Sequence, residues 1–175
     1  MLATIQRTHH CGQLGTRQIG EHVKLNGWVH NRRDLGGVIF LDVRDRSGIV
    51  QVVCNPEFDE EAAALADKLR NEYVIAVAGE VVARDPETVN PNLATGEIEV
   101  RATKIELLNN AKTPPFTINQ TNVDVDESIR LKYRFLDLRR EVMQQTLKIR
   151  HKTTQTIRRF LDARDLLDQT MIVFT

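Results

Sequence analysis

The chain of 175 residues is poor in cysteine, in aromatic side chains and in long apolar runs, and each shortage excludes a class of protein. Its two cysteines, Cys11 and Cys54, stand far apart in the sequence, whereas zinc sites use closely spaced pairs of ligands. Lone cysteines and the lack of a recognisable secretory leader favour a reducing, cytoplasmic location. The apolar runs are too short to cross a bilayer, so we expect no membrane partner.

The chain also lacks an excess of charge of either sign. Lysine and arginine total 24, as do aspartate and glutamate, so the formal charge is zero and by itself indicates no partner. A nucleic-acid site must therefore appear as a local basic cluster. The sequence has no phosphate-binding loop, nucleophile elbow or close cysteine–histidine pairing. We predict no catalytic, cofactor-binding or metal-binding residues in this chain.

Alternating apolar and polar residues predict a mainly β protein. Every second residue from Val23 to Val29 is apolar or glycine, which is the pattern of a half-buried strand. We expect strands over residues 23–29, 38–43, 49–53, 73–82 and 97–108, and a helix over residues 58–69, where the apolar spacing becomes that of one helical face. Asp59 is the predicted N-cap of this helix.

Three strands, a helix and two further strands form the element order of the OB-fold, a five-stranded barrel. We predict that residues 1–110 form this barrel with one inserted helix. Prolines and polar residues over 111–128 indicate a linker, and residues 129–175 are expected to form a basic helical tail. In other proteins the barrel binds oligonucleotides on the face of its second and third strands, but the fold alone does not decide the function.

Four residues of the predicted strands are candidates for contacts with nucleic acid. Arg32 and Arg33 lie in the run 30–34 at the end of the first strand, where guanidinium groups suit phosphates and base edges but equally suit a solvated strand end. Phe40 could stack on a base or belong to the core, because residues 38–41 are all apolar. The amide of Gln51 could read a base edge or simply be a surface group. We predict that Phe40 and Gln51 both point outward.

The predicted tail is strongly basic. Between Ile129 and Arg159 it has ten lysines and arginines, Arg130 and Lys132 among them, against two acidic residues. Such a segment repels itself unless an anion is near, and we favour RNA phosphate over acidic surfaces elsewhere in the chain. Residues 142–164 also carry an apolar face, which predicts a tail that is either poorly ordered or self-associating. The face consists of Ile149, Thr153, Ile157, Phe160 and Leu161.

Four strings of residues resemble bacterial aspartyl-tRNA synthetases, and the resemblance extends from about residue 8 to about residue 161. The strings are CGQL at 11–14, GWVHNRRDLGGVIFLDVRDRSGIVQVV at 27–53, ATGEIEV at 94–100 and RLKYRFLDLRR at 130–140. Asparaginyl and lysyl enzymes share parts of this pattern in looser form. CGQL, the spacing within the second string and ATGEIEV point to the aspartyl enzymes.

The resemblance implies an anticodon-binding barrel, a short hinge and the beginning of a class II catalytic domain. It implies that Phe40 stacks on the middle anticodon base and that Gln51 hydrogen-bonds the same base. Arg33 and Glu99 would then read neighbouring bases, and the loop 85–96 would touch the first one. The basic hinge would lie along the tRNA. The expected partner is a tRNA with the aspartate anticodon, and asparagine tRNA is a second candidate.

The chain departs from this family near its end. Residues 148–164 match the long helix of class II motif 1, but residues 165–175 lack the proline-containing strand that follows in the family. The arginines of motifs 2 and 3 are absent as well. We therefore expect tRNA recognition without aminoacylation and without a cofactor, although ATP and magnesium serve the full-length enzymes. The alternative is a non-catalytic oligonucleotide-binding or regulatory module that associates with a parent synthetase.

Overall fold

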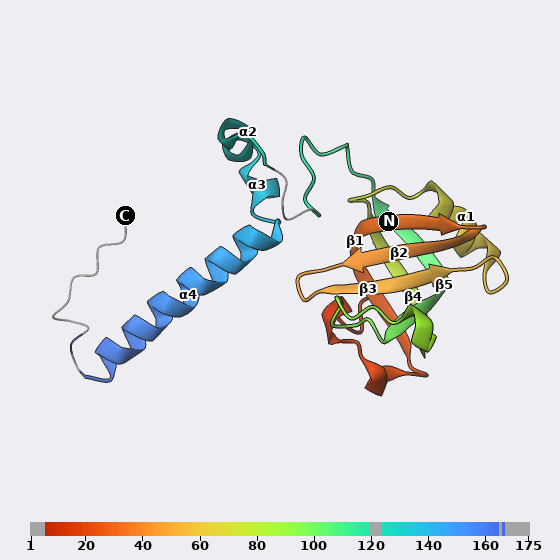
Figure 1. Cartoon of the computed structure of the whole chain (residues 1–175), viewed down its shortest axis with the longest axis horizontal. Helices are drawn as coiled ribbons and strands as arrows, with labels where there is room; N and C mark the ends of the chain where they lie inside the picture. The colour runs from red at the N-terminus through yellow and green to blue at the C-terminus, as the bar shows by residue number, and fades with distance from the viewer. Residues whose placement is uncertain (1–5, 120–123, 165, 167–175) are drawn as a thin grey trace. The chain divides into compact units, whose positions relative to one another are not determined.

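The structure, a computed structural model, describes residues 6–119, 124–164 and 166 (Figure 1). Its contacts divide the chain into two units, Met1–Lys112 and Thr113–Thr175, which are described separately below. The first unit contains all five strands and the helix between them, and the second contains three further helices. Except for Leu166, the departure of residues 165–175 from the family pattern lies outside the described residues.

The first unit is a closed five-stranded barrel, which confirms the predicted OB-fold with one inserted helix. The strands are β1 (His22–Leu35), β2 (Val38–Arg44), β3 (Ile49–Cys54), β4 (Val74–Ala83) and β5 (Ile98–Asn109), and α1 spans Glu60–Lys68. They hydrogen-bond in the order β1, β2, β3, β5, β4 and back to β1. All of these pairings are antiparallel except the one between β3 and β5.

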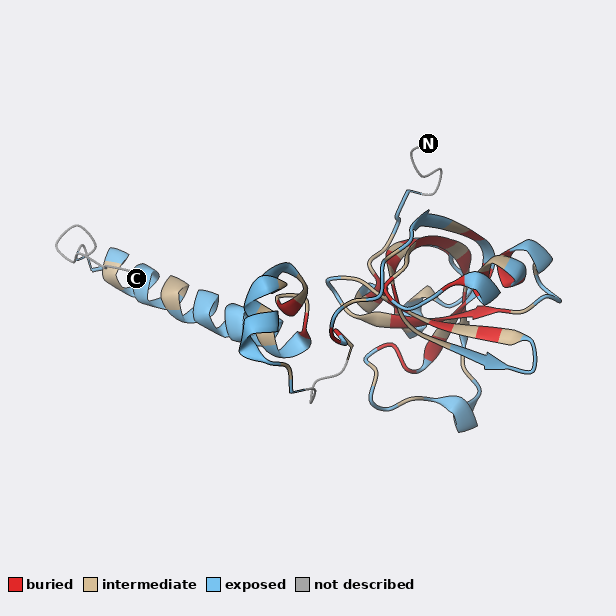
Figure 2. Cartoon of the chain, turned by 90° about the horizontal axis from the view of Figure 1, so that it is seen from above, coloured by how far each residue is buried: buried red, intermediate tan, exposed pale blue. Residues whose placement is uncertain are grey.

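The barrel core is formed by the inward positions of the strands and by one face of α1 (Figure 2). In β2 the alternation is regular, with Ile39, Leu41 and Val43 buried between partly exposed neighbours. Asp59 caps α1 as predicted, because its carboxylate accepts the backbone N–H of Ala62 at 2.7 Å. Phe58, which the sequence placed on the buried helical face, is instead about half exposed at 51%.

Strand β1 contains a bulge that the alternation did not reveal. Up to Val29 the odd-numbered residues face inward, and Val29 lies opposite Val43. The register then shifts, so that Asn31 lies opposite Asp42 and Arg32 opposite the buried Leu41. One extra residue therefore reverses the two faces of the strand from this point on. The run 30–34 lies within β1 and does not mark its end.

Strand β2 is joined to β1 and to β3 by two tight turns. Gly36 and Gly37 both have positive φ, +66° and +93°, as the two central residues of a tight hairpin turn require. At the other end, the Asp45 carboxylate accepts the backbone N–H of Cys11 at 2.9 Å, which holds the CGQL segment against the β2–β3 turn. A side chain at Gly12 would come within 2.4 Å of the Ser47 carbonyl oxygen, so glycine is required there.

The second unit consists of α2 (Glu127–Lys132), α3 (Arg134–Asp137) and α4 (Glu141–Asp162). The predicted helical tail begins as expected near residue 129, but its first helix ends after Lys132, where Tyr133 leaves helical geometry. Every residue of α4 is described and none is buried, and Figure 2 colours the helix as exposed with some intermediate bands. The predicted linker is less open than its composition suggested, because Phe116 and Ile118 are buried. No helix among the described residues is long and apolar enough to span a membrane.

Asp137 organises the charges of α2 and α3. Its side chain is fully buried and pairs with three arginines: Arg134 at 2.8 Å, Arg130 at 3.2 Å and Arg140 at 3.5 Å. Burial alone would raise the pKa of Asp137, but the hydrogen bonds and positive charge of these arginines hold it below its ordinary value. Part of the positive charge that we assigned to RNA binding is therefore balanced within the unit.

Candidate nucleic-acid interface

The candidate interface is the outer face of β1, β2, β3 and β5, where the strand register aligns side chains in two rows. Residues that lie opposite each other on paired strands share one face of the sheet. The first row runs through Arg33, Phe40, Val53 and Arg101, and the second through Asn31, Asp42 and Gln51. Glu99, two residues before Arg101 on β5, joins the second row through Gln51.

A chain of hydrogen bonds links these polar side chains. One guanidinium nitrogen of Arg33 donates to Asp42 at 2.9 Å and to the amide oxygen of Gln51 at 3.1 Å. The amide nitrogen of Gln51 donates to the Glu99 carboxylate at 3.0 Å. These bonds fix the orientation of the amide, because its oxygen faces a donor and its nitrogen faces an acceptor. We refer to Asp42, Arg33, Gln51 and Glu99 as the polar relay.

The relay presents different chemistry at its two ends. Arg33 is half exposed at 52% and, besides the two N–H groups bound within the relay, has three further N–H groups for a ligand, whereas Glu99 offers carboxylate oxygens only. Gln51 is 4% exposed and lies between them. Burial raises the pKa of Glu99 above its ordinary value, and the bond from Gln51 and the charge of Arg84 offset part of this effect.

Phe40 is a partly exposed ring next to the relay. Its neighbours Ile39 and Leu41 are buried in the core, so Phe40 lies on the outer face, between Arg33 and Val53 in the register. Gln51 is on this same face, although its surroundings cover it almost completely. Both side chains thus point outward. An aromatic ring beside hydrogen-bonding groups is suited to an unstacked nucleobase, whose face and edge need different partners.

The other predicted site residues lie elsewhere. Arg32 is on the opposite side of β1 from Arg33, and its guanidinium donates to the Ala66 carbonyl oxygen at 3.2 Å and to Asp67 of α1. It therefore attaches the helix to the barrel and does not join the relay. Arg130 and Lys132 belong to the helical unit, where Arg130 binds Asp137 and the Lys132 ammonium lies 5.6 Å from the centre of the Tyr133 ring.

The bulge that sets which of Arg32 and Arg33 faces outward is held by a largely buried ion pair. Arg44 donates to both oxygens of Glu72, at 2.9 and 3.1 Å, and to Nδ1 of His30, the extra residue, at 2.8 Å. Beside it, the backbone of Val29 bonds to Glu72 and Tyr73 at 2.7 and 2.9 Å. Glu72 itself has a positive φ of 69°, which is uncommon outside glycine. These contacts place the bulge at a defined point of the strand.

Sequence reasoning did not identify Asp42, Arg84 or Glu72. Asp42 interrupts an apolar strand two residues after Phe40, and this spacing could have shown that both occupy one face. Arg84 lies 4.0 Å from Glu99, with a side chain only 10% exposed and a buried Nε that has no hydrogen-bond partner. No pattern in the sequence joins Glu72 to His30, because 42 positions separate them along the chain.

Comparison with known proteins assigns both units. Residues 23–108 match the family described as OB-fold nucleic acid binding domain, and residues 126–170 match the class II tRNA synthetases (D, K and N). The aspartate–tRNA ligases of Geobacillus kaustophilus and Staphylococcus epidermidis are 57% and 55% identical over 94% and 93% of this chain. The chain spans 28% of the length of each relative. The asparaginyl-tRNA synthetase of Pyrococcus horikoshii matches with a TM-score of 0.76 and 26% identity, over 92% of this chain and 35% of that one.

The barrel, the relay on its outer face and these matches together define an OB-fold nucleic-acid-binding domain joined to the start of a class II tRNA synthetase domain. The resemblance seen in the sequence is confirmed. Over 93–94% of its length, the chain is similar to bacterial aspartate–tRNA ligases at 55–57% identity.

We predict that the carboxylate of Glu72 stabilises the barrel, whereas the positive φ of Glu72 lowers its stability. Glu72→Ala should lower the free energy of unfolding by about 2 kcal/mol, since it removes charged hydrogen bonds from a buried arginine. Glu72→Gly loses the same bonds but adopts positive φ freely, so it should be about 1 kcal/mol more stable than Glu72→Ala. Urea unfolding of both variants measures this difference. Equal stability of Glu72→Ala and the unchanged chain would contradict the assigned role.

Proposed function

We propose that this chain recognises the anticodon of aspartate tRNA, as the RNA-binding part of a cytoplasmic aspartate–tRNA ligase. The observation that carries the proposal is the polar relay beside Phe40. Burying a glutamine amide and a carboxylate is unfavourable unless they are hydrogen-bonded, and here both are hydrogen-bonded on the outer face, next to the half-exposed Arg33 and the partly exposed Phe40. Such a surface favours a ligand with planar faces and polar edges, as nucleobases have.

The relay matches the bases of the aspartate anticodon, which from its 5′ end is guanine, uracil, cytosine. Uracil in the middle position presents two carbonyl acceptors and one N–H donor. The Gln51 amide supplies an acceptor and a donor to this base, while Phe40 stacks on the ring. Arg33 and Glu99 read the neighbouring bases, and guanine presents adjacent N–H donors on its pairing edge, which suits the carboxylate of Glu99. We expect the loop 85–96, which leads into β5, to contact the first base.

Asparagine tRNA is a second substrate that this chemistry allows. Its anticodon keeps guanine and uracil and replaces the third base by uracil. The groups proposed for the first two bases therefore do not distinguish the two tRNAs. Any discrimination has to come from the third base, where the change exchanges an amino donor for a carbonyl acceptor.

The test is binding of the chain to RNA hairpins that carry the anticodon loop. A hairpin with the aspartate anticodon should bind more tightly than one with a changed middle base. A wrong base leaves buried polar groups of the relay without partners, and such sites discriminate strongly. Equal affinity for both hairpins, measured by fluorescence anisotropy, would refute the proposal.

Variants of Phe40 and Gln51 distinguish stacking of a base on the ring from hydrogen bonding to the edge of that base. Phe40→Ala should weaken hairpin binding by ~1–3 kcal/mol, the range for the loss of one base–aromatic stack, with little loss of fold stability. Phe40→Leu is the matched control, since it keeps an apolar side chain but removes the ring. Gln51→Ala should reduce discrimination at the middle base more than it reduces overall affinity. A Phe40→Leu chain that binds as tightly as the unchanged protein would exclude stacking.

The raised pKa of Glu99 predicts a pH-dependent affinity. If the ionised carboxylate accepts hydrogen bonds from guanine, protonation removes the acceptor, so binding weakens as the pH falls through this pKa, above the ordinary value of about 4.3. The fold does not lose stability from Glu99 in this range, because a carboxyl group with a raised pKa favours folding as it is protonated. In titrations of hairpin affinity from pH 7 to pH 5, Glu99→Gln should flatten the profile. Identical profiles for both proteins would contradict the role.

We also propose that the barrel folds by itself and that the full chain self-associates through α4. The helix exposes Ile149, Ile157 and Phe160 at 65%, 49% and 53%, and an apolar face of this kind favours association. A fragment that ends at Lys112 should therefore be monomeric and show a cooperative thermal transition, whereas the full chain should sediment as a larger species. A monomeric full chain, or a fragment without a transition, would contradict the respective part of this expectation.

A further inference from the structure

The first row of the outer face continues beyond Phe40. Val53 is the apolar residue next to Phe40, and Arg101 of β5 lies opposite Val53. The guanidinium carbon of Arg101 lies 5.2 Å from the centre of the Phe58 ring, which belongs to the turn between β3 and α1. Phe40 and Arg101 are two strand spacings apart, about 10 Å. The row thus places a second aromatic–cation pair beside the proposed base site.

Packing of the helix start explains only part of this arrangement. Phe58 directly precedes the N-cap Asp59, and an apolar residue at this position often packs against the first helical turn. Phe58 nevertheless leaves 51% of its surface exposed, and the exposed Arg101 lies over its ring. The turn is well fixed, because the Phe58 N–H donates to the Asn55 carbonyl oxygen at 2.9 Å. An ordered aromatic ring and a guanidinium are therefore presented together to solvent.

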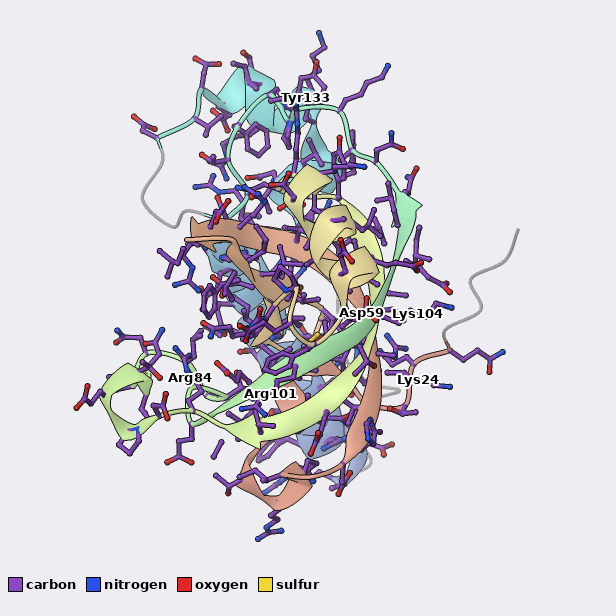
Figure 3. The ribbon with its side chains drawn as sticks, turned by 90° about the vertical axis from the view of Figure 1, so that its right-hand side faces the viewer. Lys24, Asp59, Arg84, Arg101, Lys104 and Tyr133 are labelled. Carbon is purple, nitrogen blue, oxygen red and sulfur yellow. The ribbon has the colours of Figure 1, made fainter. Side chains whose placement is uncertain are left out.

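The charge at this part of the barrel suits an anionic, planar ligand. Arg101 is close enough to Glu99 to lower its pKa, as is Arg84, so both cations adjoin the relay. Figure 3 shows Arg84 and Arg101 in one region of the barrel, and Lys24 and Lys104 together in another. The register agrees, since Lys24 and Lys104 both lie opposite Ala78. Lys104 is thus a cation of the same strand that lies outside the interface.

We propose that Phe58 and Arg101 bind an unpaired base of the anticodon loop outside the three bases of the anticodon. This inference rests on the proposed anticodon recognition and extends its surface. Single-stranded bases stack on aromatic rings and on guanidinium planes, and every base has such a face. The pair offers no fixed acceptor of its own, so it adds affinity without base selectivity. Arg101 also neutralises phosphate, which makes part of this affinity salt-dependent.

The experiment measures binding of the full chain to the aspartate anticodon hairpin and to hairpins with one abasic nucleotide at each loop position outside the anticodon. Phe58→Ala and Arg101→Gln should each lower affinity for the intact hairpin between about 5-fold and 100-fold, as for one lost base stack. One abasic position should weaken the unchanged chain by a similar factor but leave Phe58→Ala unaffected, because base and ring act as a pair. Lys104→Gln, which removes the same charge from the same strand, should keep the full abasic effect.

The outcomes separate this inference from the anticodon proposal. If the unchanged chain does not discriminate between anticodons, the proposed function fails, and this inference fails with it. If it discriminates but every abasic hairpin affects Phe58→Ala as much as the unchanged chain, only the present inference is overturned. Thermal unfolding of each variant identifies loss of fold. Arg101→Gln leaves the apolar packing of Phe58 intact, so it provides the same test should Phe58→Ala unfold.

Discussion

The outer face of the barrel depends on the bulge at His30, where β1 has one residue more than β2 opposes. Without that residue Arg33 would face the core and Arg32 would face the solvent side of the sheet. With it, Arg33 joins Asp42 and Gln51, and Arg32 binds the carboxyl end of α1. The buried pair of Arg44 and Glu72 keeps the extra residue at this point. The extra residue thus assigns Arg33 to the candidate interface and Arg32 to the contact that holds α1 on the barrel.

The polar relay shows how a small barrel can be both stable and selective. Asp42, Gln51 and Glu99 are largely enclosed, so the bond between Gln51 and Glu99 acts in a medium of lower polarity than water and holds the amide in one orientation. The same enclosure makes an unmatched ligand group unfavourable. In the proposed complex, Phe40 contributes the part of the affinity that does not depend on base identity. Affinity and selectivity would then come from neighbouring but chemically different side chains on one sheet.

Much of the fold could be predicted from the sequence because its determinants are local. The five strands, the inserted helix and the cap at Asp59 follow from residue spacing within each element. The bulge could not be predicted, because it is fixed by contacts between β1 and Glu72, which is distant in sequence. Arg32 and Arg33 were assigned to one site because they are adjacent in the sequence. Adjacent residues of a strand, however, lie on opposite faces of the sheet. Phe58 fitted the helical spacing, yet it precedes the cap and lies outside the helix.

The site was predicted unevenly. Gln51 stood out as an amide in an apolar strand, and Phe40 as an aromatic ring that could either stack on a base or belong to the core; both lie on the outer face. The role of Glu99 came from family resemblance, and the structure adds the hydrogen bond that joins it to Gln51. Asp42 and Arg84 act through neighbours on other strands, so only the register reveals them. RNA binding by the tail was predicted from its number of basic residues, and this number does not show which of them already pair with acidic residues.

The buried carboxylate of Asp137 has a consequence for how the helical unit responds to ions. Three of its basic side chains converge on one acid and are held by it, so fewer of the ten cations counted in the sequence are free to displace counterions from RNA. The guanidinium of Arg134 is about half exposed at 46%, so this cation is both held by Asp137 and open to solvent. Around Asp137 the unit is therefore a preformed cluster of three guanidinium groups on one carboxylate, in which the positions of the charges are set by the fold.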